Sequence, residues 1–172
     1  DALLPHAKFI HMVRDPRDVA ASMLKMRFGA NDAVTAALDW AGNLGAWLVS
    51  ERLVPEHRRL EIRYEDLCAD PEGTLARVAR LLGIPEAQVK PALDQHAQAL
   101  AGPGSRKQVG RHTRDLTPRQ VRNIEEVAQL GMLAYGYEPG AWHLSPVMED
   151  RRLHFAKAYL RDAARAARRK AL

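Results

Sequence analysis

The sequence predicts an α/β fold, in which a parallel sheet is flanked by helices and the carboxyl-terminal half is rich in helix. Two short apolar segments, Phe9 to Val13 and Leu60 to Tyr64, have the length and composition of buried strands. The residues between them are mainly helical in pattern, which suits parallel strands joined by a crossover that is right-handed by default. Helical periodicity resumes at Pro71, so we expect more helix than strand.

The first predicted strand leads directly into a helix start. Asp15 occupies the N-cap position, Pro16 the first helical position and Asp18 the third, where a carboxylate favours the positive helix end. We expect the backbone N–H groups of this turn, the guanidinium of Arg14 and the hydroxyl of Ser22 to hold an anion. The alternative is an ordinary surface ion pair between Arg14 and Asp15.

A second helix is predicted from Asp32, a capping residue, to about Val54, where Pro55 ends it. Trp40 and Trp47 are seven residues apart and therefore share one helix face. A stripe of core residues is the preferred interpretation of this pair, and an aromatic platform for a ligand is the alternative.

Further helices are predicted after the second strand. One runs from Pro71 to Leu82 and ends at Gly83, which suits the position after a helix. Another covers Glu86 to Leu100, with a restart near Pro91.

The last helix of the main pattern is capped by Thr117 and runs to about Ala134. Within it we assign Glu125 and Glu126 to the solvated face and not to acid–base chemistry.

The stretch from Ala101 to Ser105 is the clearest flexible segment, because its glycines permit backbone angles that other residues avoid. Arg106 and Lys107 follow it directly. We interpret this pair as a clamp that closes on an anion, and the alternative is a solvated pair of charges.

Four segments resemble, in order, sulfotransferases that use 3′-phosphoadenosine 5′-phosphosulfate (PAPS). The run from Arg14 to Val19, Arg-Asp-Pro-Arg-Asp-Val, with Ser22 after it, resembles the motif that binds the 3′-phosphate. The other three are Leu60 to Leu67 with its Tyr-Glu-Asp-Leu turn, the helix start Pro71 to Leu75, and the basic loop Ser105 to Arg111 that precedes Leu116-Thr117-Pro118. The resemblance spans about residues 4 to 140.

The resemblance implies a P-loop-NTPase-like sheet and a set of binding residues. Arg14 and Ser22 would contact the 3′-phosphate, Arg106 would anchor it with help from Lys107, and Tyr64 would place the adenine. PAPS would be the co-substrate, and the family needs no metal.

The sequence departs from the family pattern at its amino-terminal end. No segment matches the glycine-rich phosphate loop, and the family's catalytic base also precedes the first strand seen here, so we expect both upstream of Asp1 and interpret the chain as incomplete there. His6 and His11 are the nearest titratable groups, but a structural role suits His11 better because it lies within a strand. His112 stands where many relatives carry tryptophan.

Composition indicates one soluble domain, residues 1–140, followed by a helical extension, residues 141–172. The 172 residues are 47% hydrophobic and 27% charged. No apolar run approaches the roughly 18 residues that span a membrane, and no signal peptide is visible. The single cysteine, Cys68, suits a reducing compartment, so we expect a cytoplasmic protein.

The basic character of the chain is concentrated at its carboxyl end. Residues 151–172 carry eight lysines and arginines against Asp162 alone, a net charge of +7, so the remainder is −2 within the total of +5. This segment predicts a helix that packs on its own domain, joins subunits into a homo-oligomer, or meets acidic lipid or nucleic acid. We expect no specific nucleic-acid binding and no membrane contact.

The predicted function is transfer of a sulfuryl group from PAPS to the hydroxyl or amine of a small-molecule or glycan acceptor. One alternative is a non-catalytic module that keeps the fold and acts through nucleotide binding or its basic helix. Another is a kinase relative in which the arginine motif belongs to a lid. The sequence does not identify the acceptor.

Overall fold

The computed structural model describes residues 5–27, 29–100 and 109–140, with side chains described up to residue 95 in the second range. The elements are β1 (Phe9–Val13), α1 (Pro16–Met23), α2 (Ala33–Ser50), β2 (Arg59–Arg63), α3 (Tyr64–Ala69), α4 (Pro71–Leu82), α5 (Val89–Leu100), α7 (His112–Asp115) and α8 (Pro118–Ala134), with short 3₁₀ turns at Glu51–Leu53, Glu56–Arg58 and Glu86–Gln88. The predicted segments 101–107 and 141–172 lie outside the described residues.

The two strands form a parallel pair, as predicted. Phe9 pairs with Arg59 and Val13 with Arg63, so both strands end at the same edge of the sheet. An α/β arrangement is therefore present, and within the described residues the sheet has these two strands only. Arg14 and Tyr64 are the first residues beyond the strands and emerge beside each other.

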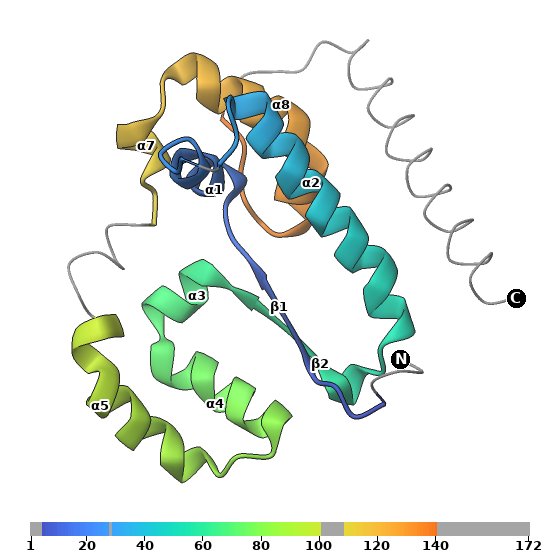
Figure 1. Ribbon diagram of the computed structural model, residues 1–172, viewed down its shortest axis with the longest axis vertical. Coiled ribbons are helices and arrows are strands. Elements are labelled where there is room, and N and C mark those ends of the chain that lie inside the picture. The colour runs from blue at the N-terminus through green and yellow to red at the C-terminus, as the bar shows by residue number, and fades with distance from the viewer. Residues whose placement is uncertain (1–4, 28, 101–108, 141–172) are drawn as a thin grey trace, which may run out of the picture.

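Helices cover both faces of the sheet (Figure 1). On one face α2 and α8 lie side by side, and on the other lie α3, α4 and α5. The core between the sheet and the α2–α8 pair contains Val13, Trp40, Leu44, Met132 and Tyr137, each less than a tenth exposed. Burial of these apolar side chains is the main force that holds the pair against the strands.

The α1, α2 and α8 helices meet through small side chains. Ala20, Ala36, Ala37 and Ile124 are essentially inaccessible at this contact. Alanine lets helix backbones approach closely, which explains the many alanines in the sequence of α2. The approach fixes α1, and with it the turn after β1, against the α2–α8 pair.

Three helix starts follow the predicted capping residues. Asp15, Asp32 and Thr117 each accept a backbone N–H of the next turn, and Thr117 forms a capping box with Gln120. Three boundaries differ from the prediction. Tyr64 begins α3 and does not end the strand. The helix expected to reach about Val54 ends at Ser50, and the helix expected from Glu86 begins at Val89, each next to a 3₁₀ turn. None of the helices in the described ranges is long and apolar enough to cross a membrane.

Candidate functional site

The side chain of Arg14 lies over the ring of Tyr64, at the carboxyl edge of the sheet. Its guanidinium carbon is 4.4 Å from the centre of that ring, a cation–π arrangement. The indole N–H of Trp40 donates to the backbone carbonyl of Arg14 at 3.0 Å, which fixes the main chain at this point. Two of the predicted site residues, Arg14 and Tyr64, therefore lie together, and the parallel register explains why.

The start of α1 is already capped by the protein. The carboxylate of Asp15 accepts the N–H of Arg17 at 2.9 Å, and Pro16 has no N–H. The expectation of free N–H groups is therefore wrong for these two positions. The alternative of a surface ion pair between Arg14 and Asp15 is also wrong, because Asp15 is buried and its carboxylate forms an ion pair with Arg17 at 2.7 Å.

The carboxylate of Asp18 is fully buried and holds the segment that leads into α7. One oxygen accepts the backbone N–H of Gly110 at 2.7 Å, and the other accepts that of His112 at 3.0 Å and contacts its ring Nδ1 at 2.6 Å. Burial alone would raise the pKa of Asp18, but the hydrogen bonds from His112 and Gly110 outweigh it and hold that pKa below its ordinary value. Asp18 is therefore ionised at neutral pH.

Asp18 also lies between the two predicted phosphate contacts along the chain. Asp18 and Ser22 are four residues apart on α1 and so share one helical face, and Arg14 lies just before the helix, four residues ahead of Asp18. A guanidinium nitrogen of Arg14 is 3.7 Å from the Asp18 carboxylate, and Ser22, one turn further on, is half-buried. The site therefore has an arginine, a carboxylate and a hydroxyl in a row.

The end of the predicted basic loop reaches this same face. Gly110 and His112 are bound to Asp18, so residues 110–112 lie beside α1. Arg106 and Lys107, the predicted clamp, lie outside the described residues. The approach of this late segment to the Arg14 motif could not be read from either segment alone.

Glu65 is a connecting residue that the sequence analysis missed. Its carboxylate accepts the backbone N–H of Asp15 at 3.0 Å and the hydroxyl of Tyr137 at 2.7 Å. It thus joins the turn after β2 to the start of α1 and to the residues after α8. The only sequence signal was its place beside Tyr64 in the Tyr-Glu-Asp-Leu turn.

Glu125 was assigned to the solvated face of its helix, and that assignment is wrong. It is 1% exposed, and its carboxylate meets the guanidinium of Arg17 at 2.7 Å. Burial alone would lower the pKa of Arg17, but hydrogen bonds and charges from Asp15 and Glu125 raise it. Arg17 is therefore held in its charged form.

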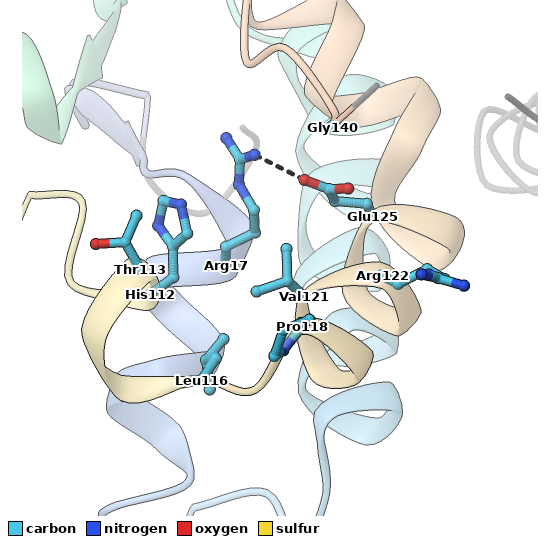
Figure 2. Close-up of a pocket in the computed structure, with 9 residues that line it drawn as sticks. All are labelled: Arg17, His112, Thr113, Leu116, Pro118, Val121, Arg122, Glu125 and Gly140. Carbon is cyan, nitrogen blue, oxygen red and sulfur yellow. Dashed lines mark hydrogen bonds and ion pairs between the residues drawn. The ribbon is translucent and has the colours of Figure 1, made fainter. Parts of the chain in front are cut away.

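A hollow of about 470 Å³ lies beside this ion pair (Figure 2). In this view Arg17 lies between His112 and Glu125. Its lining residues are Arg17, His112, Thr113, Leu116, Pro118, Val121, Arg122, Glu125 and Gly140. Of the arginines in this lining, Arg17 is engaged by the carboxylates of Asp15 and Glu125.

His11 is part of a hydrogen-bonded cluster on the α2–α8 face of the sheet. Its Nδ1 lies 3.1 Å from the carboxylate of Glu61, and its ring stacks on Trp47 with centroids 4.6 Å apart. The same carboxylate accepts the indole N–H of Trp47 at 3.0 Å and the hydroxyl of Tyr135 at 2.7 Å. These contacts support the structural role expected for His11.

Metal ligands are not grouped at the site. Across the described ranges, no three His, Cys, Asp or Glu side chains lie in an arrangement that could hold a metal ion. The structure brings the Arg14 guanidinium together with the ring of Tyr64 and near the carboxylate of Asp18.

The chain belongs to the sulfotransferase family, whose model matches residues 1–88. It is also similar to omega-hydroxy-beta-dihydromenaquinone-9 sulfotransferases of Mycobacterium bovis and Mycobacterium tuberculosis. Identity to each is 35% over 97 aligned residues, which cover 48% of this chain and 24% of the relative. The chain therefore matches only about a quarter of the length of these relatives. No solved structure matches it.

Proposed function

We propose that the polypeptide containing this chain is a PAPS-dependent sulfotransferase and that this chain supplies the half that binds the 3′-phosphate. Family membership supports the transferase class. The observation that carries the proposal further is that three separate segments meet. Arg14, which precedes α1, lies over Tyr64 at the end of β2, and Asp18 of α1 accepts the backbone N–H of Gly110.

The residues present fit a 3′-phosphorylated adenine nucleotide. The guanidinium of Arg14 can donate two parallel hydrogen bonds to a phosphate, which a lysine ammonium does not match. The hydroxyl of Ser22 would donate to the same group, and Arg106 with Lys107 would approach it from the basic loop. Tyr64 would contact the adenine. These roles rest on the family motif as well as on the position of Arg14.

The proposed work of these side chains is alignment and charge neutralisation. When bound, PAPS supplies an activated sulfuryl group. Arg14 would neutralise the 3′-phosphate, and Tyr64 would orient the base, so that the opposite end of the nucleotide is presented to an acceptor. The catalytic base and the loop for the 5′-phosphosulfate would come from the part of the polypeptide before Asp1.

A hydroxyl is the preferred acceptor. The names of the two relatives describe an omega-hydroxy compound, and a hydroxyl was already one of the two acceptor groups expected from the sequence. We extend that preference to this chain as a proposal, with the acceptor itself either a small molecule or a glycan. A cytoplasmic location and a homo-oligomer formed through residues 141–172 are proposals of the same kind.

The test compares 3′-phosphoadenosine 5′-phosphate with adenosine 5′-monophosphate, which lacks the 3′-phosphate. Isothermal titration of the full-length polypeptide should show clearly tighter binding of the first. Arg14→Lys should reduce that affinity about tenfold, because it removes a bidentate contact to the phosphate. It should change the affinity for adenosine 5′-monophosphate much less.

Arg119→Lys is the matched control, because Arg119 is an exposed arginine at the start of α8, away from the Arg14 turn. It should leave both affinities unchanged. Equal affinities of the unmodified protein for the two nucleotides would remove the proposed roles of Arg14 and Ser22.

A further inference from the structure

The carboxylate of Asp18 is the point where two distant parts of the site are joined. It is inaccessible to solvent and accepts the backbone N–H groups of Gly110 and His112 while its other neighbours are the His112 ring and Arg14. A buried carboxylate is costly unless donors surround it, so this arrangement stabilises the ionised side chain only while all of them stay in place.

The turn at Gly110 is shaped to present these donors. Gly110 has a φ of +70°, a backbone conformation that side chains disfavour, and it is followed closely by the short helix α7. This conformation directs two N–H groups, from Gly110 and His112, toward one carboxylate. The turn is therefore built around Asp18, and Arg14 meets the same carboxylate from the sheet side.

We propose that Asp18 is a positioning residue, which holds Arg14 and the turn at residues 110–112 in one arrangement around the anion. This inference rests on the proposed function, because it assigns the role to the 3′-phosphate site. Asp18 does not touch the nucleotide; it acts through Arg14 and through the turn. His112 completes the arrangement because its ring Nδ1 is one of the donors.

If Asp18 acted only through its negative charge, removal of that charge would strengthen anion binding, whereas a positioning role predicts weaker binding. A carboxylate 3.7 Å from Arg14 competes with a phosphate for that guanidinium, so its neutralisation would strengthen anion binding. If Asp18 instead holds the site together, its neutralisation leaves buried N–H groups without an ionic acceptor and releases the turn. The direction of the change in affinity therefore separates the two.

The experiment measures the affinity of the full-length polypeptide for 3′-phosphoadenosine 5′-phosphate and for adenosine 5′-monophosphate. Asp18→Asn should weaken binding of the first about tenfold, the cost of a buried polar group that loses its partner. It should affect the second much less. Asp32→Asn is the matched control, because Asp32 also accepts backbone N–H groups at a helix start but lies on α2. It should leave both affinities unchanged.

A pair of variants at His112 keeps the test decisive even if Asp18→Asn fails to fold. His112→Asn retains an N–H that can reach Asp18 from the position of ring Nδ1, whereas His112→Phe has none. We expect His112→Phe to weaken binding of 3′-phosphoadenosine 5′-phosphate several-fold, about as for a lost hydrogen bond to a charged group, and His112→Asn to restore it.

Three outcomes are distinguishable. Weaker binding in Asp18→Asn and His112→Phe, with rescue in His112→Asn, supports the inference. Unchanged or tighter binding in a folded Asp18→Asn, or equal affinities of the two His112 variants, overturns it while the proposed function stands. An unmodified protein that shows no preference for the 3′-phosphate overturns the proposed function, and this role of Asp18 with it.

Discussion

Arg14 and Arg17 are three residues apart, and their guanidinium groups lie in different surroundings. Arg17 is engaged by the carboxylates of Asp15 and Glu125 and by the backbone carbonyl of Glu138. Arg14 lies over the ring of Tyr64, and one of its guanidinium nitrogens is 3.7 Å from the carboxylate of Asp18. Arg17 therefore contributes to the stability of the fold, and the contact of Arg14 with an anion is part of the proposed function.

The ion pair between Arg17 and Glu125 should be important for stability. Glu125→Gln is expected to lower the free energy of unfolding by about 1–3 kcal/mol, because it leaves a buried charge with fewer partners. Denaturant unfolding followed by circular dichroism measures this. The neighbouring Glu126→Gln is the control, and it should stay within about 0.5 kcal/mol of the unmodified protein. A similar small effect of both substitutions would contradict the role given to Glu125.

The lowered pKa of Asp18 predicts a dependence of stability on acid. Since the folded-state pKa lies below the ordinary value of 3.8, the ionised carboxylate stabilises the fold above that pH. The contribution is lost as the pH falls through the lowered pKa. Unfolding curves between about pH 4 and pH 2 should therefore show a smaller loss of stability in Asp18→Asn than in the unmodified protein. Parallel losses would show that Asp18 has no such linkage.

The sequence predicted correctly those residues whose hydrogen-bond partners are close to them in the chain. Asp15, Asp32 and Thr117 cap helices because a capping residue bonds to its own next turn. Glu125 could not be placed in this way, because its burial depends on an arginine 108 positions earlier. The same holds for Asp18, whose partners lie more than 90 positions later.

At the level of elements, Gly131 of α8 lies in tight contact with α2. A methyl group added there would lie 2.6 Å from both Leu44 and Trp40 of α2, closer than real contacts allow. Gly131→Ala should therefore force the helices apart and reduce stability by about 1–3 kcal/mol. The thermal unfolding midpoint of the purified protein should fall accordingly.

Gly42 provides a control within α2 itself. A methyl group there meets nothing within 4 Å, so only helix propensity changes. Gly42→Ala should raise stability by about 0.5–1 kcal/mol. If both glycine substitutions shift the midpoint in the same direction, the close approach of α2 and α8 is not what limits position 131.

The order and type of the described elements were predictable, and their ends less so. Apolar periodicity and capping residues indicated the helices from Pro71 and from Pro118, which begin and end as expected. The second strand was predicted to run from Leu60 to Tyr64. In the structure the helical turn begins at that residue, and this puts the ring under Arg14.

For the whole molecule, the predicted fold is confirmed in part. The parallel pairing and the helices on both faces agree with an α/β arrangement. Ile10 and Met12 of β1 are 43% and 49% exposed, which is high for apolar residues of a strand. A larger P-loop-NTPase-like sheet, to which the missing first strand would belong, remains a prediction.

The basic carboxyl-terminal segment gives the prediction at this scale. Its apolar face, as the sequence has it, consists mostly of alanines with Leu153 and Leu160, a pattern that suits contact between helices. If residues 141–172 join subunits, a variant that ends at Gly140 should sediment as a monomer and the unmodified protein as an oligomer. Identical sedimentation of the two proteins would refute assembly through this segment.

The indole of Trp40 has a consequence for experiments on ligand entry. It is nearly inaccessible, and its N–H is attached to the main chain of Arg14. Any displacement of that arginine on docking changes the polarity around the ring, so the wavelength of its emission becomes an intrinsic optical reporter. With Trp47 and Trp142 replaced by phenylalanine, the emission of Trp40 would report the binding of a ligand at Arg14 without an added dye.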